Sequence, residues 1–236
     1  MARASHPTPS TLATAPTSPA PLLQTVPLPW TAPAALPEAL ETDRLRLRYW
    51  QARDAAGMLA ALDADRSSYL PWLPWVEADN LNHEQCVFNI ERFRRRRADP
   101  GCDDFVVGIF DKATDAPLGG TGLHRVQPAW HEAEIGYWID PRARGRGFCT
   151  EAIAGLIGWA LAPQDRGGWG LRRIHIRCAA TNAASAAIPR KLGLTHEATL
   201  RKERFVPGIG WDDTLVFSVL VGEWSRPPAM RASRDA

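Results

Sequence analysis

The stretch DPRARGRGFCTEAI, residues 140–153, places three arginines and two glycines directly before an apolar run with helical spacing. The segment before it is typical of a strand ending near Asp140, and the helix is expected to begin near Gly147. The first N–H groups of a helix have no internal acceptor and, together with the helix dipole, favour an anion. Gly145 and Gly147 let the backbone approach a ligand and can adopt positive φ. This junction therefore predicts an anion cradle.

The arginines of this junction, Arg142, Arg144 and Arg146, add positive charge that suits a pyrophosphate. The junction is not a P-loop, because no Gly-Lys-Ser/Thr follows, and it lacks the G-x-G-x-x-G spacing of dinucleotide-binding turns. From these residues alone, a nucleic-acid contact and a solvated loop stay open as alternatives.

The composition is typical of a globular chain. Of the 236 residues, 45% are hydrophobic and 23% charged, and the net charge of +2 is too small to indicate nucleic-acid binding by itself. Four cysteines without a C-x-x-C pair argue against a zinc site or a disulfide framework, so we expect no metal and a reducing, cytoplasmic environment. No apolar run approaches the roughly 20 residues that a membrane helix needs, so a soluble protein is expected.

The two ends of the chain differ in amino-acid composition from its middle. Residues 1–37 hold nine of the 20 prolines and no acidic residue, which predicts a disordered arm. A transit peptide is the less favoured alternative, because only Arg3 is basic and the prolines prevent an amphipathic helix. The globular domain is predicted over 38–224, and 225–236 is expected to be a flexible tail.

Within the domain, hydrophobic spacing predicts alternating strands and helices. Asn182 is expected to cap the start of the last helix and Gly193 its end. The strands are predicted over 44–50, 104–112, 118–126, 132–140 and 172–180, the helices over 52–70, 83–98, 147–161 and 182–193, and two more strands complete the domain.

Several motifs in this order resemble a known family. Arg142-x-x-Gly145-x-Gly147, after the strand AEIGYWI and opening a helix, resembles the acyl-CoA-binding motif of the GNAT N-acetyltransferase superfamily. NAASAAIPRKLGL, residues 182–194, is similar to the family's second, Asn-led helix. The subfamily of ribosomal-protein N-terminal-alanine acetyltransferases is suggested by ETDRLRLR (41–48), YLPWLPW (69–75) and GIGWDDTLVFSVLVGEW (208–224).

The resemblance covers about 38–224 and implies an α+β fold of three layers. Its sheet would be mixed but mostly antiparallel, with about seven strands, a splayed central parallel pair and helices on both faces. It also implies acetyl-CoA as co-substrate, an amine acceptor and, as is frequent in this family, a homodimer. Nucleic acid and membrane are not expected as partners.

The resemblance also implies a set of CoA-binding residues. Backbone N–H groups of the glycine-arginine junction would receive the pyrophosphate, the strand before it would run beside the pantetheine arm, and Asn182 would hydrogen-bond that arm. The set is Tyr137, Trp138, Ile139, Arg142, Arg144, Gly145, Arg146, Gly147, Phe148, Cys149, Thr150, Asn182 and Lys191.

Acyl transfer to an amine needs a base, because a protonated amine is not a nucleophile. Glu134 matches the family's strand glutamate and is the candidate base, with Glu132 on the same strand face as its competitor. His124 and His131 are weaker candidates, and His175 is expected only on a polar strand face. A backbone N–H near Trp138 would stabilise the oxyanion of a tetrahedral intermediate.

The departing thiolate needs a hydrogen-bond donor, and here the chain departs from the family. Many members carry a tyrosine seven residues after the asparagine, where this chain has Pro189. Ser185 therefore becomes the candidate acid. Because Pro189 has no N–H, we also expect a kink that leaves the carbonyl of Ser185 free beside the thioester.

The acceptor is less well defined. Trp72 and Trp75 are candidates for its cleft, although both could instead belong to the core. Glu132 or Asp213 could hold its ammonium, although Asp213 could instead only brace the turn. RFRRRR, residues 92–97, is favoured as a solvated helix face over a ribosome contact.

Two function classes follow from these motifs. The first is an acetyl-CoA-dependent N-acetyltransferase that acts directly on a protein N-terminal amine, or on a small amine such as an aminoglycoside or polyamine. The second is a non-catalytic module that binds an acyl-CoA or a ribosomal partner. Glu134 and Ser185 favour the enzyme.

Overall fold

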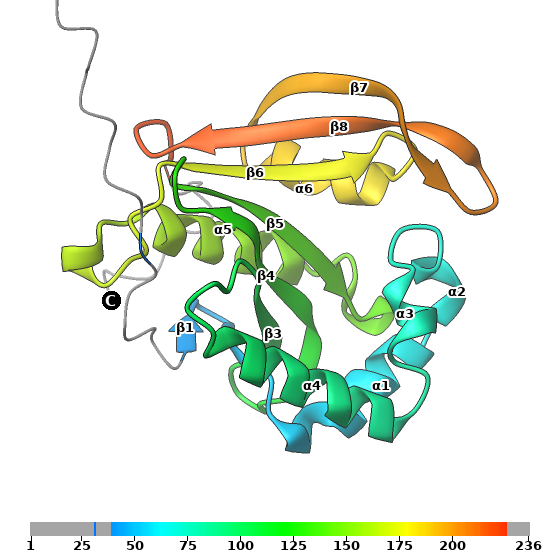
Figure 1. The fold of residues 1–236 in the computed structure, drawn as a ribbon. Coiled ribbons are helices and arrows are strands. Elements are labelled where there is room, and N and C mark those ends of the chain that lie inside the picture. Colours follow the sequence, from blue (N-terminus) through cyan, green and yellow to red (C-terminus); the bar gives the residue numbers. More distant parts are fainter. Residues whose placement is uncertain (1–30, 32–38, 226–236) are drawn as a thin grey trace, which may run out of the picture.

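The computed structural model describes residue 31 and residues 39–225, which form one eight-stranded sheet with helices on both faces (Figure 1). The arm expected over 1–37 and the tail expected over 225–236 lie outside these residues, apart from residues 31 and 225. The strands are β1 Ala39–Glu41, β2 Leu45–Tyr49, β3 Phe105–Asp111, β4 Pro117–Gln127, β5 Glu132–Ile139, β6 Arg173–Ala179, β7 Thr195–Val206 and β8 Gly210–Leu220. The helices are α1 Ala55–Asp63, α2 Arg66–Tyr69, α3 Trp75–Ala78, α4 His83–Arg97, α5 Phe148–Leu161 and α6 Ala183–Lys191.

The sheet has the order β1-β2-β3-β4-β5-β6-β8-β7 and is antiparallel except between β5 and β6. That parallel pair is joined only from Glu132 opposite Arg173 to Glu134 opposite His175. Beyond these positions β5 continues to Ile139 and β6 to Ala179 without pairing with each other. The predicted fold class and its splayed central pair are therefore confirmed, with eight strands where about seven were expected.

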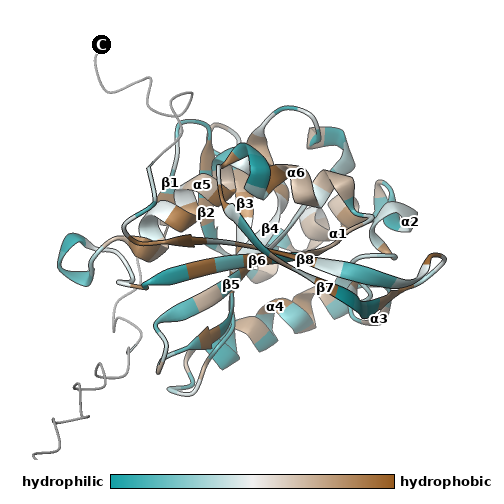
Figure 2. Ribbon diagram, turned by 90° about the horizontal axis from the view of Figure 1, so that it is seen from above, coloured by the Kyte–Doolittle hydropathy of each residue, from teal (hydrophilic) through white to brown (hydrophobic). Residues whose placement is uncertain are grey.

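Two hydrophobic cores lie on opposite faces of the sheet. The larger packs α5 and α6 against one face, and α5 is apolar along most of its length (Figure 2). The smaller packs α1 and α4 against the other face, around Trp50 and Phe110. Side chains alternate between the faces of a strand, so Ile135 faces the larger core while Trp138 packs against the smaller one.

Trp138 can occupy that position because β4 carries a glycine directly opposite it. Gly120 pairs with Trp138, and a Cβ at Gly120 would come 2.4 Å from the indole nitrogen. The indole also stacks on Trp50, with ring centroids 6.4 Å apart, and meets Tyr69 edge-on at 6.0 Å. These contacts fix the position of the Trp138 side chain without a ligand.

The expected helix over 52–70 is interrupted in the structure. A 3₁₀ turn over Ala52–Asp54 leads into α1, and α2 begins separately after Asp65, whose carboxylate accepts a hydrogen bond from the Ser68 N–H. A side chain that caps the backbone in this way competes with continuation of the preceding helix. The short helix α3 is also absent from the sequence prediction.

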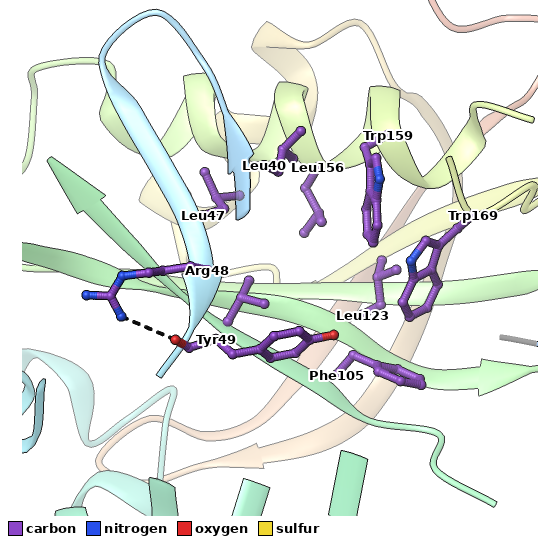
Figure 3. A pocket seen from close by; sticks show the side chains of 10 residues that line it. Leu40, Leu47, Arg48, Tyr49, Phe105, Leu123, Leu156, Trp159 and Trp169 are labelled. Carbon is purple, nitrogen blue, oxygen red and sulfur yellow. Dashed lines mark hydrogen bonds between the residues drawn. The ribbon is translucent and has the colours of Figure 1, made fainter. Parts of the chain in front are cut away.

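A small cavity lies between the sheet and α5, lined by apolar side chains of β2, β3 and α5 (Figure 3). Its volume of about 30 Å³ is that of one water molecule, so it is a packing defect rather than a ligand site.

Among the helices of the described part of the chain, none combines the length and the apolar character needed to cross a membrane.

Candidate active site

A cavity of about 780 Å³ opens where β5 and β6 part. It is lined by the ends of both strands that do not pair with each other, the junction before α5, the start of α6 and the aromatic segment around α2 and α3. Most of the residues singled out in the sequence meet here: Trp72, Trp75, Glu134, Tyr137, Trp138, Ile139, Arg144, Gly145, Gly147, Phe148, Cys149, Thr150, Asn182, Ser185 and Lys191.

Four of the sequence-predicted residues do not line this cavity. Arg142 forms an ion pair with Asp140 at 2.6 Å, and Arg146 lies over the Phe148 ring. Glu132 pairs with Arg173 at 3.4 Å, and Asp213 accepts the Lys202 backbone N–H at 2.9 Å. Each of these side chains has a partner within the fold, so a ligand contact would require it to exchange that partner.

The junction before α5 has the conformation expected of an anion cradle. Gly145 and Gly147 have φ of +75° and +80°, in the left-handed region that favours glycine. The first helical N–H with a backbone acceptor is that of Glu151, which bonds the Gly147 carbonyl. Within the described part of the chain, the N–H groups from Gly145 to Thr150 have no acceptor. They are free to bind an anion at the positive end of the helix dipole.

The first turn of α5 is anchored to the loop between β1 and β2 by a buried glutamate. Glu151 accepts hydrogen bonds from Thr42 Oγ1 at 2.6 Å, the Arg44 N–H at 2.9 Å and Arg44 Nε at 2.7 Å. Burial raises the pKa of Glu151, but the bonds from Thr42 and Arg44 outweigh it, so the pKa lies below its ordinary value. The carboxylate is therefore charged, and it fixes the helix end from which the free N–H groups project.

The last helix is capped at both ends as its sequence predicts. Asn182 Oδ1 accepts the Ser185 N–H at 3.0 Å. After the helix, Gly193 has φ of +74°, its N–H bonds Arg190 O, and the Leu194 N–H bonds Pro189 O. This pair of bonds is a Schellman ending. The two caps fix the orientation of α6 beside the cavity.

The prediction that the Ser185 carbonyl is free is wrong. Pro189 supplies no N–H to it, but the Tyr137 hydroxyl of β5 donates to that carbonyl at 2.8 Å, and α6 continues to Lys191. The Ser185 hydroxyl lies 3.3 Å from the same Tyr137 oxygen. Tyr137 thus replaces the missing helix donor and holds the candidate acid at the cavity wall.

Glu134 lies at the point where β5 and β6 separate. Its Oε2 is 2.7 Å from Arg125 Nη1 and 3.6 Å from His175 Nε2. Burial raises the pKa of Glu134, but the contact with His175 and the charges of Arg125 and Arg177 outweigh it, so the pKa lies below its ordinary value. Glu134 is therefore ionised at neutral pH, as an acceptor of protons must be.

The histidines named as alternative bases lie elsewhere. His124 is held by Asp104, with Nδ1 2.5 Å from the carboxylate oxygen, and it does not line the cavity. His131 lies in the turn between β4 and β5, also outside the cavity lining. His175 shares the strand face of Glu134, as the alternation along its strand predicts.

Two cysteines line the cavity, and both are held in the thiol form. Burial raises the pKa of Cys149 to about 12, and burial also raises the pKa of Cys178. A buried thiol with a raised pKa is a poor nucleophile. The site therefore favours direct transfer to the acceptor over an acyl-enzyme on cysteine. Among the described residues, no group of three or more His, Cys, Asp or Glu side chains could hold a metal ion.

Sequence reasoning missed three arginines of the cavity lining, Arg125, Arg177 and Arg204. Arg177 was recognised only as part of a polar strand face, and the other two lie in strands that carry no recognisable motif. Arg125 and Arg204 lie at irregularities of β4 and β7, for which the sequence offers no signal.

The arrangement of groups around the cavity indicates a class of protein. A cavity passes between two splayed parallel strands, with free helix N–H groups at one end and an ionised carboxylate at the other. Such a site accepts a long phosphate-bearing donor and promotes group transfer to a second molecule that must lose a proton.

The acetyltransferase (GNAT) domain family matches residues 44–195, and the chain belongs to this family. It is an N-acetyltransferase that uses acetyl-CoA as co-substrate. The resemblance read from the sequence motifs is thereby confirmed.

Relatives and solved structures agree with this assignment. The chain is 29% identical over 181 residues to the uncharacterized N-acetyltransferase YoaA of Bacillus subtilis, which covers 77% of this chain and 96% of YoaA. It is 27% identical over 107 residues to the ribosomal-protein-serine acetyltransferase of Escherichia coli, or 45% of this chain and 56% of that protein. RimL, a ribosomal L7/L12 alpha-N-protein acetyltransferase solved with coenzyme A, shares the fold with a TM-score of 0.66 at 20% identity, over 78% of this chain and 98% of RimL.

Proposed function

We propose that this protein acetylates the α-amine at the N-terminus of another protein. The observation that carries the proposal is the cavity itself, which joins free helix N–H groups on one side of the sheet to Glu134 on the other. The names of the ribosomal-protein relatives support a protein acceptor.

In the proposed complex, the N–H groups from Gly145 to Thr150 hold the pyrophosphate, with Arg144 and Lys191 adjacent to them. Acetyl-CoA supplies the activated acyl group as a thioester. Of the expected ligands, Arg142 and Arg146 contribute charge to this end rather than direct contacts, because their side chains are engaged within the fold.

Glu134 receives the proton of the acceptor amine, directly or through one water. Its lowered pKa keeps it charged, so it attracts the ammonium form first. A carboxylate with a low pKa is a weak base, and the nearby arginines compensate by favouring the neutral form of the bound amine. Glu134 therefore accepts the proton, and the positive charges of the nearby arginines help the bound amine to lose it.

Ser185 donates a hydrogen bond to the departing thiolate. Its hydroxyl lies in the cavity wall at the start of α6 and donates to the Tyr137 oxygen at 3.3 Å, so it turns from that oxygen to the sulfur when it acts as donor. Burial raises the pKa of Tyr137, so the phenol stays protonated and keeps Ser185 in place. Tyr137 is in this sense a positioning residue.

The test is an acceptor screen with acetyl-CoA, measured as CoA release. We expect turnover with peptides that carry a free N-terminus and none with the same peptides blocked at the N-terminus. Turnover confined to aminoglycosides or polyamines would contradict the protein acceptor. Tight acetyl-CoA binding with no turnover on any amine would instead support a non-catalytic module.

A further inference from the structure

The cavity has an excess of positive charge at the end opposite the helix N–H groups. Its lining contains five basic side chains and one carboxylate, Glu134. Arg144 and Lys191 lie on the side of the glycine junction and α6, where the CoA phosphates are proposed to bind. The other three have no role in that binding: Arg125 of β4, which pairs with Glu134, Arg177 of β6, whose charge lowers the pKa of Glu134, and Arg204 of β7.

Two of these arginines reach the cavity through irregularities in their strands. The register of β4 shifts between His124 and Gln127, and Arg125 itself has φ of +49°. The register of β7 shifts between Leu200 and Arg204, with Lys202 also at φ of +49°. Positive φ in a residue other than glycine is strained, and bulges of this kind redirect side chains next to functional sites.

The bulge in β7 is held by a side chain first considered as a substrate ligand. Asp213 of β8 accepts the Lys202 N–H at 2.9 Å, within the irregular stretch. Asp213 thereby braces the backbone that carries Glu203 and Arg204. Asp213 therefore acts at the acceptor end by fixing the positions of Glu203 and Arg204, rather than by contacting the acceptor itself.

The hydrogen bonds of the three arginines leave part of their capacity unused. Arg125 pairs with Glu134, and Arg177 pairs with Glu203. Arg204 donates from Nε to Thr214 Oγ1 at 3.0 Å and has no carboxylate partner among the described residues. Arg177 Nε is buried without any partner in the described part of the chain. A buried donor without a partner is costly, and a bound ligand relieves that cost.

We propose that the acceptor carries a carboxylate close to its reactive amine, as an N-terminus followed by an acidic residue does. The inference rests on the proposed function and specifies its substrate class. The ligand carboxylate would bind Arg204 and Arg177 while the amine meets Glu134. An acceptor with a basic second residue is disfavoured by the same charges.

The experiment compares peptides that differ only at their second residue, Ala-Glu, Ala-Gln and Ala-Lys, with acetyl-CoA saturating. We expect kcat/KM for the glutamate peptide to exceed that for the glutamine peptide by about tenfold, the scale of one hydrogen bond to a charged group. The lysine peptide is expected to be the poorest. Equal rates for the glutamate and glutamine peptides would overturn the inference while leaving the proposed function standing.

Arg204→Gln is the matching variant of the enzyme. It should reduce the preference for the glutamate peptide to about twofold or less, because the unpaired charge is gone. Acetyl-CoA affinity, measured by calorimetry, should stay unchanged and shows that the variant is folded. A full acidic preference in Arg204→Gln would contradict the assignment. The control is Arg95→Gln on α4, outside this cavity, which should retain the preference.

A further arm identifies the source of the carboxylate. Free glutamate carries it on the same residue as the amine, and the Ala-Glu peptide carries it on the next. We expect the peptide to be acetylated faster, and faster acetylation of free glutamate would overturn the peptide assignment. Turnover of small polyamines with none of any peptide would instead overturn the proposed function itself.

Discussion

The two ends of the active-site cavity are built from different parts of the polypeptide. At the CoA end, the ligand is offered backbone N–H groups from one continuous stretch, Gly145 to Thr150. At the proposed acceptor end, it is offered side chains from four strands, Glu134 among them. The first arrangement is indifferent to most side-chain changes and the second depends on them. Such a division suits a donor that stays the same and an acceptor that varies.

The largest effect is expected at the acceptor end, where one side chain, Glu134, is proposed to act as the base. Glu134→Gln removes the proton acceptor while keeping the shape, so kcat/KM should fall about 100-fold or more, the usual range for a general base. Glu132→Gln is the matched control, since Glu132 lies on the same strand face but outside the cavity lining. Steady-state rates that fall equally in both variants would remove Glu134 from its proposed role.

At the CoA end, a backbone change should matter more than a side-chain change. Gly147→Ala places a Cβ on a residue with φ of +80°, where a Cβ meets only Arg44 Nη2 at 3.5 Å. Its cost is therefore backbone strain of about 1–2 kcal/mol, together with crowding of the anion cradle. We expect acetyl-CoA affinity to fall about tenfold by calorimetry.

The control for this change separates strain from ligand binding. Gly167 has φ of +78°, nothing within 4 Å of its Cβ position, and no place in the cavity lining. Gly167→Ala should lower the thermal stability by a similar amount and leave acetyl-CoA affinity unaltered. Equal affinity losses in both variants would show that the glycine junction acts through the fold alone.

The same division explains how much of the site could be predicted from the sequence. The CoA end is local in the chain, so Gly145, Gly147 and the Asn182 cap could be identified from spacing and turn chemistry. The resemblance to a family then supplied the mixed, mostly antiparallel sheet and its splayed central parallel pair. Glu134 was found in the same way, because it lies in the strand that leads into the motif.

The arginines of the acceptor end could not be predicted, because their positions depend on non-local pairing. Nothing in the residues around Arg125 or Arg204 indicates a bulge, since bulges arise from the register between strands distant in the chain. Pro189 shows the same limit. Its missing N–H is evident in the sequence, but the Tyr137 hydroxyl that replaces that donor is brought there by the fold.

A smaller effect is expected where the two ends meet, at Ser185. Ser185→Ala should lower kcat about tenfold with little change in KM for the acceptor, because the hydroxyl is proposed to act on the departing thiolate. Pre-steady-state measurement of CoA release would isolate that step. An unchanged kcat would exclude Ser185 as the donor.

Tyr137→Phe should affect both stability and rate, and so tests the positioning role. It leaves the Ser185 carbonyl without a donor, which should cost about 1–3 kcal/mol of unfolding free energy for a buried unpaired group. The rate should fall by no more than in Ser185→Ala, and in the double variant the two kinetic losses should not add. Additive losses would mean that the two hydroxyls act independently.

The smallest effect is expected in the pH profile, and it tests which group at the acceptor end titrates. The pKa of Glu134 is lowered in the folded protein, so Glu134 is already ionised throughout the neutral range and loses its charge only in acid, below its ordinary pKa. Between pH 6 and 9, in rough terms, the rise of kcat/KM should therefore follow the deprotonation of the acceptor amine. Acceptors with different amine pKa values should shift that rise accordingly. A rise at the same pH for every acceptor would assign it to an enzyme group instead.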